Sequence, residues 1–169
     1  MRGRRLRQEA GRPARRGPGA CRARYLVTGG TGLLGQHLVD ELVTSGHRVR
    51  VLARTAEGSA RGRRRRRGRE HDLIEVVQGS VTDREAVDQA LEGMEGVFHL
   101  AGVVEHSRKD AAALHAVNVG GTLTVLAAAA AAGLRRVVYA STSGCVGVSK
   151  GPDFVANDAS PYATELVKE

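Results

Sequence analysis

The stretch YLVTGGTGLLGQHLV, Tyr25 to Val39, decides the fold. An apolar run ending at Thr28 leads directly into a turn that contains three glycines, Gly29, Gly32 and Gly35. Leucines spaced by four residues then predict a helix with one apolar face: Leu34, Leu38 and Leu42. Glycines of this kind can serve tight packing alone. A strand, a glycine turn and a helix in this order favour a dinucleotide, because backbone N–H groups can then approach its pyrophosphate.

Short apolar runs alternate with longer periodic segments through the rest of the chain. Strands are predicted at 47–53, 73–78, 96–102 and 136–141, and a long helix at about 111–132. The sequence TDRE at 82–85 is typical of a capping box, and Gly93 can close the helix that it opens. Strands that alternate with helices imply parallel βαβ units. We predict a Rossmann-type, doubly wound α/β fold with five parallel strands in the order 3-2-1-4-5.

The composition sets limits on size and on class. With 169 residues of which 41% are hydrophobic, the chain can bury the core of a single domain. It has no Trp and two Phe, so it lacks the aromatic platforms on which single-stranded nucleic acids stack. We expect a Rossmann domain over residues 24–161, between an Arg-rich tail at 1–23 and a short last segment at 162–169.

The positive charge is confined to two Arg-rich segments. Residues 1–24 carry nine Arg and one Glu, and residues 61–70 carry seven Arg and one Glu. Because the whole chain carries +8, the other 135 residues carry −6. Arg-rich segments can bind phosphate backbones, but solvated tails and loops have the same composition. No helix-turn-helix, zinc or RNA-binding signature accompanies them, which disfavours nucleic-acid binding. We expect a disordered tail, and an exposed loop over 55–72.

The sequence shows no clear signal for secretion, for a membrane span or for a metal site. The tail has no hydrophobic run that could serve as a secretory signal. No stretch of about 18 residues has the composition expected of a membrane span, although residues 117–134 come closest. Cys21 and Cys145 lack metal-ligand spacing. The sequence therefore predicts a reduced, cytoplasmic protein without a metal site or a membrane partner.

Five blocks resemble a known family: VTGGTGLLG, VVQGSVTD, VFHLAG, NVGGTLTVL and RVVYASTSGCVG. Their order and spacing are similar to those of the extended short-chain dehydrogenases/reductases, from about Tyr25 to Pro161. This group includes NAD(P)-dependent sugar epimerases, dehydratases, and dihydroflavonol-4-reductase-like and 3β-hydroxysteroid dehydrogenase-like enzymes. The resemblance implies a nicotinamide cofactor and a small-molecule carbinol or ketone substrate, and it allows a homodimer. It does not indicate which substrate.

The resemblance also assigns cofactor-binding residues. The turn after the first strand would surround the pyrophosphate, and Ser80 and Val81 would lie beside adenine. The family usually has Asp in place of Ser80. Residues of the VFHLAG block would pass under the nicotinamide ribose, and Asn118 would face the cofactor. The full set is Gly29, Gly32, Leu33, Leu34, Gly35, Ser80, Val81, Leu100, Ala101, Gly102 and Asn118.

The end of the second strand bears on the choice of nicotinamide cofactor. An acidic residue there would accept hydrogen bonds from the ribose 2′-hydroxyl, whereas a basic residue tolerates a 2′-phosphate. The strand ends in Val51, Leu52 and Ala53, and Arg54 follows. A guanidinium can bind a phosphate through two hydrogen bonds. Arg54 therefore favours NADP(H), although a solvated loop residue is the other interpretation.

The catalytic residues of the family are only partly present. Thr142 aligns with the family's catalytic hydroxyl, with Ser141 as the alternative. The family's Tyr and Lys, in a YxxxK pattern, are missing, because Tyr162 has Leu166 four residues on and Lys168 has the wrong spacing. The sequence therefore resembles only the amino-terminal, cofactor-binding portion of such an enzyme, and we expect no turnover by this chain alone. His99 lies in a predicted strand, and we expect its side chain to be packed and not to bind a metal.

Three hypotheses on function follow. The first is the NAD(P)-binding portion of an extended short-chain dehydrogenase/reductase. The second is a non-catalytic dinucleotide-binding module that acts as a sensor or a partner protein. The third is an Arg-mediated nucleic-acid binder.

Overall fold

The computed structural model describes residues 22–55, 72–104, 111–142, 145, 157 and 159–160. The predicted tail up to residue 21, the Arg-rich loop at 56–71 and the last segment at 162–169 lie outside the described residues. Ala23 already belongs to the folded body. It is buried, and its carbonyl accepts a hydrogen bond from the Arg48 backbone N–H at 3.0 Å.

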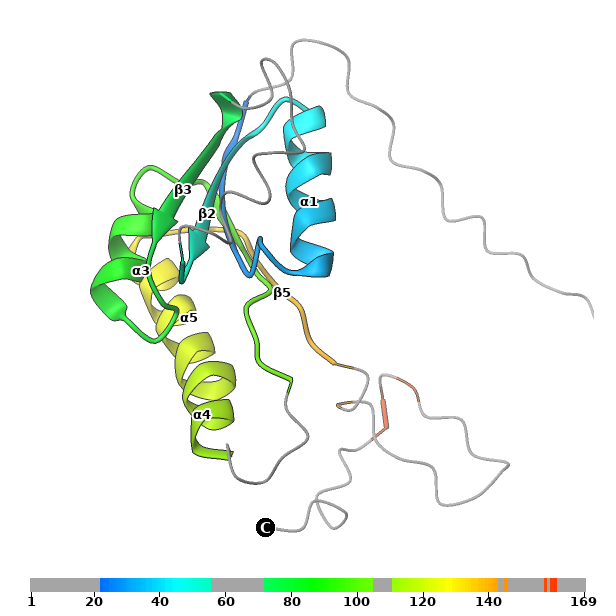
Figure 1. Ribbon diagram of the computed structural model, residues 1–169, viewed down its shortest axis with the longest axis vertical. Coiled ribbons are helices and arrows are strands. Elements are labelled where there is room, and N and C mark those ends of the chain that lie inside the picture. Colours follow the sequence, from blue (N-terminus) through cyan, green and yellow to red (C-terminus); the bar gives the residue numbers. More distant parts are fainter. Residues whose placement is uncertain are drawn as a thin grey trace, which may run out of the picture.

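Five strands form one parallel sheet with helices on both faces (Figure 1). The strand order is β3-β2-β1-β4-β5, and each neighbouring pair is parallel. This result confirms the predicted fold class and strand order. The strands are β1 (Arg24–Thr28), β2 (Arg48–Ala53), β3 (Ile74–Gln78), β4 (Gly96–His99) and β5 (Val137–Tyr139).

The sheet separates the core into two layers, and helices cover each layer. Helix α1 (Leu33–Thr44) covers one face of the sheet, and α3 (Arg84–Leu91) covers the other together with α5 (Thr122–Ala131) (Figure 1). Alternate side chains of each strand supply the two layers. In β1, Leu26 packs in the α3 and α5 layer and Val27 in the α1 layer, and both are completely buried.

Helix α3 begins one residue later than the predicted capping box. Its N-cap is Asp83, whose carboxylate accepts a hydrogen bond from the Ala86 backbone N–H at 3.2 Å. The Thr82 hydroxyl instead contacts the Ser80 hydroxyl at 2.8 Å. The capping-box interpretation of Thr82 is therefore wrong, because the carboxylate of Asp83 already satisfies the helix terminus. Gly93 follows the end of the helix, as predicted.

The predicted long helix is interrupted by a π-helical segment. It consists of α4 (Ala111–His115), η3 (Ala116–Gly121) and α5, which follow one another without a break. Residues Ala111–Ala131 are long and apolar enough to cross a membrane by length and composition, so the expectation that no stretch would qualify is wrong on this criterion. In this fold, Val125, Ala128 and Ala129 of α5 are buried in the core layer that also contains α3.

Arg50 of β2 joins the sheet to the end of α3. Its Nε donates to Glu75 of β3 at 2.8 Å, and its Nη1 donates to the carbonyl oxygens of Ala90 and Glu92, each at 3.0 Å. These carbonyls lie at the C-terminus of α3, where a helix has no internal donors left and where its dipole favours a cation. Arg50 thus fixes α3, and with it the β3–α3 turn, against the sheet.

The turn after β1 depends on Gly29. Its φ of +70° lies in the left-handed region, and a Cβ there would lie 2.6 Å from both Ala101 N and Leu100 C. Gly35 of α1 is equally close, because a Cβ on it would lie 2.6 Å from Gly30 Cα. The first turn of α1 and the end of β4 therefore both approach the Gly29 turn so closely that no Cβ fits between the backbones.

We expect Arg50→Met to lower the free energy of unfolding by about 1–3 kcal/mol, because several carbonyls and Glu75 lose a charged donor. The matched control is Arg84→Met, which removes an exposed ion pair with Asp88 (2.8 Å, side chains 50% and 49% exposed). That pair should contribute about 0.5 kcal/mol or less. Urea unfolding measures both variants, and equal losses would contradict the role assigned to Arg50.

We expect Gly29→Ala to destabilise the fold more than Gly133→Ala does. Gly133 has nearly the same φ, +68°, but a Cβ there meets nothing within 4 Å. Gly133→Ala should therefore cost only the backbone strain, about 1–2 kcal/mol. Gly29→Ala should cost about 1–3 kcal/mol more, since the backbone of β4 must move. Equal losses in urea unfolding would show that the close approach at Gly29 is unimportant.

Candidate functional site

A cleft opens at the carboxyl edge of the sheet. Its volume is about 240 Å³, and its walls come from the turns that follow β1, β2, β3 and β4. Chain connections diverge between β1 and β4, since β2 and β3 lie on one side of β1 and β4 and β5 on the other. Ligands of open α/β sheets bind at such a switch point. The lining residues are Gly29, Thr31, Gly32, Leu52, Ala53, Arg54, Gly79, Ser80, Val81, Leu100, Ala101, Gly102, Val103 and Val117.

Most of the predicted cofactor residues meet in this cleft. Those that line it are Gly29, Gly32, Arg54, Ser80, Val81, Leu100, Ala101 and Gly102. The sequence reasoning missed Gly79, although its place directly after β3 is a usable signal. A Cβ on Gly79 would lie 2.8 Å from the Cβ of Ala86 and 2.9 Å from Leu52 Cδ1. This glycine therefore lets α3 pack closely against the turn that follows β3.

Six predicted site residues are not among those that line the cleft: Leu33, Leu34, Gly35, Asn118, Thr142 and its alternative Ser141. Gly35 is buried beneath the turn, whereas Leu33 and Leu34 are 84% and 62% exposed on the first turn of α1. Thr142 is exposed after β5, and Ser141 beside it donates a hydrogen bond to Cys145 Sγ at 3.7 Å. The catalytic role of Thr142 and the cofactor contacts of the two leucines stay predictions.

The electrostatics of the cleft suit an anion. Gly32 is the N-cap of α1 and offers no side-chain oxygen, and the first turn of α1 contains no acidic residue. The N–H groups of that turn have no acceptor within the helix and carry the positive end of its dipole. Arg54 adds a full positive charge, and no carboxylate is among the described residues that line the cleft.

A buried polar cluster lies beneath the cleft floor. Thr28 and His99 are both 0% exposed. The Thr28 hydroxyl is 2.7 Å from His99 Nδ1, and His99 Nε2 is 3.0 Å from the Thr122 hydroxyl. Thr28 Oγ1 also accepts a hydrogen bond from the Ala101 backbone N–H at 3.2 Å. Burial lowers the pKa of the His99 imidazole below its ordinary value of 6.5.

His99 is packed, as predicted. Both ring nitrogens contact threonine hydroxyls, and Tyr139 of β5 stacks on the ring with the centroids 5.5 Å apart. Within the part of the chain that the structure describes, no three His, Cys, Asp or Glu side chains are grouped as metal ligands would be.

Asn118 clamps the loop after β4. Its Oδ1 accepts from the Val103 backbone N–H at 2.8 Å, and its Nδ2 donates to the Val103 carbonyl at 2.9 Å. Asn118 lies in the π-helical segment η3, which brings its amide to this loop. Its side chain therefore holds the backbone of a cleft residue, whereas the sequence analysis predicted that it would face the cofactor.

Comparisons with known proteins agree with this geometry. The model of the family described as "NAD dependent epimerase/dehydratase family" matches residues 25–166. A putative dihydroflavonol 4-reductase of Synechocystis is 36% identical over 124 residues, which are 73% of this chain and 34% of that protein. A 3 beta-hydroxysteroid dehydrogenase/Delta 5-->4-isomerase of Mycobacterium tuberculosis is 35% identical over 129 residues, 73% of this chain and 32% of that protein.

Solved structures of NAD-bound proteins are also similar to this chain. A short-chain dehydrogenase/reductase superfamily protein from Agrobacterium tumefaciens, with bound NAD, is 34% identical with a TM-score of 0.61, over 73% of this chain and 34% of that one. The UDP-glucose 4-epimerase of Thermus thermophilus, in complex with NAD, is 29% identical with a TM-score of 0.69, over 82% and 44%. The chain thus spans about a third of the length of the curated relatives given above.

The family match over residues 25–166, together with the parallel sheet and the glycine turn at its carboxyl edge, confirms the resemblance found in the sequence. This chain belongs to the NAD dependent epimerase/dehydratase family.

Proposed function

We propose that this chain binds a nicotinamide dinucleotide across the carboxyl ends of β1 and β4. In this proposal it is the cofactor-binding portion of a reductase or epimerase that acts on a carbinol or ketone. The observation that carries the proposal is the Gly29 cradle, where a Cβ would fill the space against Ala101 N. A glycine-rich turn beside a helix N-terminus with no side-chain cap fits a pyrophosphate.

Different residues of the cleft would contact different parts of the cofactor. The Gly29–Gly32 turn and the first N–H groups of α1 would hold the pyrophosphate. Ser80 and Val81 would lie on the adenine side, and the floor from Leu100 to Val103 on the nicotinamide side. When bound, the nicotinamide supplies a carbon that accepts or donates hydride. The described residues position that group and give its phosphates a favourable field.

Arg54 supports a preference for NADP(H). It follows the last residue of β2, is exposed and lines the cleft. Its carbonyl accepts a hydrogen bond from Gln78 Nε2 at 3.4 Å, which ties the strand tip to β3. A guanidinium at this position favours a 2′-phosphate, and a carboxylate that would instead favour the 2′-hydroxyl is absent from the described cleft residues.

Thr142 is the proposed hydroxyl that orients the substrate oxygen, because it follows β5 at the same edge of the sheet as the cleft. A non-catalytic dinucleotide-binding module is the second candidate function. One observation favours it: Thr142 is not among the described residues that line the cleft.

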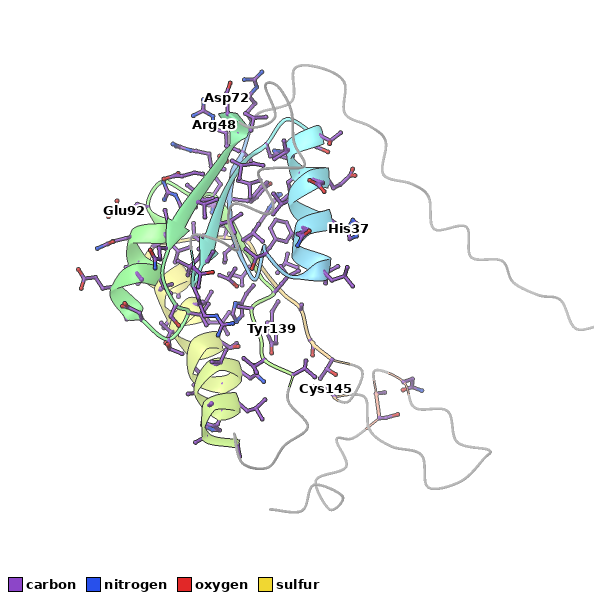
Figure 2. All side chains as sticks on the ribbon, in the orientation of Figure 1. His37, Arg48, Asp72, Glu92, Tyr139 and Cys145 are labelled. Atoms are coloured by element: carbon purple, nitrogen blue, oxygen red, sulfur yellow. The ribbon has the colours of Figure 1, made fainter. Side chains whose placement is uncertain are left out.

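We expect the chain to bind NADPH more tightly than NADH, by about 1–3 kcal/mol. Arg54→Ala should weaken NADPH binding by that amount and leave NADH binding unchanged. Arg48→Ala is the matched control, since Arg48 starts β2 at the opposite end of the sheet (Figure 2). Fluorescence titration measures the affinity of each chain for both cofactors. Equal affinities in the unsubstituted chain, or equal weakening of both cofactors by Arg54→Ala, would contradict the assignment.

We expect the 169-residue chain to bind NADPH without reducing sugar-nucleotide, flavonol-type or steroid ketones. A positioned general acid contributes about 10²–10⁴-fold, and an alcohol such as Thr142 is a poor proton donor near neutral pH. The measurement is NADPH oxidation by the purified chain beside Thr142→Ala. Steady turnover that disappears in Thr142→Ala would disprove the expectation, and it would favour the enzyme over the non-catalytic module.

A further inference from the structure

The hydrogen bonds around Thr122 fix where His99 carries its proton. The Thr122 hydroxyl lies 2.7 Å from the Asn118 carbonyl oxygen, which can only accept. A hydroxyl has a single proton, so Thr122 donates to Asn118 and can only accept from His99. His99 Nε2, which is 3.0 Å from Thr122 Oγ1, must therefore carry a hydrogen.

The hydrogen bonds around Thr28 complete the assignment. The Ala101 backbone N–H already donates to Thr28 Oγ1. In a neutral ring with hydrogen on Nε2, Nδ1 has a free lone pair, and it accepts the Thr28 hydroxyl proton across 2.7 Å. Each of these donors then has an acceptor. In the opposite neutral tautomer, with hydrogen on Nδ1, the lone pair of Nε2 would face a lone pair of Thr122 Oγ1. The Thr28 hydroxyl proton would then lose Nδ1 as its acceptor.

Protonation of His99 breaks this arrangement. A second ring hydrogen would point from Nδ1 at Thr28 Oγ1, and the Thr28 hydroxyl would have to turn its own proton elsewhere. The groups that face the ring are Thr28 from β1, Thr122 from α5 and Tyr139 from β5. Tyr139 is the titratable one of these three, and none of them carries a carboxylate that would offset the charge of an imidazolium. Burial therefore disfavours the charged ring.

Thr28 connects this cluster to the cleft. It holds the Ala101 N–H, and Ala101 lines the cleft floor. The next residue after Thr28 is Gly29, on which a Cβ would lie 2.6 Å from Ala101 N. With backbones this close, a rotation of the Thr28 hydroxyl changes the support of the floor directly beside the turn.

We propose that His99 is a positioning residue that, as the neutral Nε2–H tautomer, holds the cleft floor against the Gly29 turn, so that loss of this form weakens dinucleotide binding. The inference rests on the proposed binding of a dinucleotide in the cleft. It adds a coupling between cofactor affinity and the charge of a side chain that does not line the cleft.

The test is a calorimetric titration with NAD⁺ from about pH 8 to about pH 5. NAD⁺ is used because the 2′-phosphate of NADP⁺ is a phosphomonoester, which itself titrates near pH 6. Because the folded pKa of His99 lies below 6.5, the neutral ring is present above that pH and is lost as the pH falls through its folded value. The unsubstituted chain should bind NAD⁺ about three- to tenfold more weakly once the pH has fallen below the folded pKa of His99, the equivalent of about one neutral hydrogen bond.

Two substitutions separate the two ring nitrogens. His99→Asn places an amide oxygen near the position of Nδ1, so it can still accept from Thr28. This variant should bind NAD⁺ at pH 8 nearly as the unsubstituted chain does and lose the pH dependence. His99→Gln reaches the position of Nε2, keeps the donor to Thr122 and loses the acceptor for Thr28. It should bind about three- to tenfold more weakly at every pH. His37→Gln, on the outer surface of α1, is the matched control and should keep the full pH profile (Figure 2).

A ¹⁵N spectrum of the unsubstituted chain reads the tautomer directly, so the test does not depend on how well the variants fold. A proton on Nδ1 at pH 8, a pH profile that persists in His99→Asn, or equal NAD⁺ affinities of the Asn and Gln variants would each overturn the positioning role. Failure of the unsubstituted chain to bind NAD⁺ at pH 8 would instead refute the proposed dinucleotide site itself, and the coupling with it.

Discussion

The close approach of the Gly29 turn to the end of β4 is the constraint on which the site depends. The backbone atoms of Leu100 and Ala101 occupy the space where any other residue at position 29 would place its Cβ. This contact brings the N-terminus of α1 and the floor after β4 to the same cleft. The two-layer core holds it there, because β1, at the centre of the sheet, is buried on both faces. A Cβ at position 29 would separate the two walls and disrupt the backbone cradle for an anion.

Much of this arrangement could be predicted from local sequence. Strands buried on both faces appear as apolar runs, and glycines directly after the first of them mark the turn, so the parallel sheet and the turn followed from short patterns. The assignment of most other cleft residues came from the resemblance to the family. The helix start at Asp83, the π-helical segment and the clamp of Asn118 on Val103 could not be predicted. Each depends on where a side chain finds its partner in three dimensions. Capping by Asp83 rather than Thr82 is decided by one residue of register, and the amide of Asn118 contacts a loop 15 residues earlier in the chain.

The buried His99 cluster shows how a residue outside the cleft can bear on its chemistry. Sequence reasoning identified His99 as a packed residue, which it is, yet packing alone does not describe its contacts. Its two nitrogens join Thr28 of β1 to Thr122 of α5, and the partly exposed Arg50 joins β2 and β3 to the end of α3. The burial of Thr28 and His99 carries a desolvation cost that only specific partners offset, so their contacts fix one arrangement of the elements beside the cleft.

The most direct test of the central claim is an amide NMR titration of the ¹⁵N-labelled chain with NAD⁺. The account predicts saturable shifts at Gly29, Gly32 and the segment from Leu100 to Val103. Amides at the opposite edge of the sheet, such as those of Arg48 and Gly96, should stay unchanged. Shifts that do not saturate, or that cluster away from the carboxyl edge of the sheet, would contradict the assignment of this cleft as the dinucleotide site.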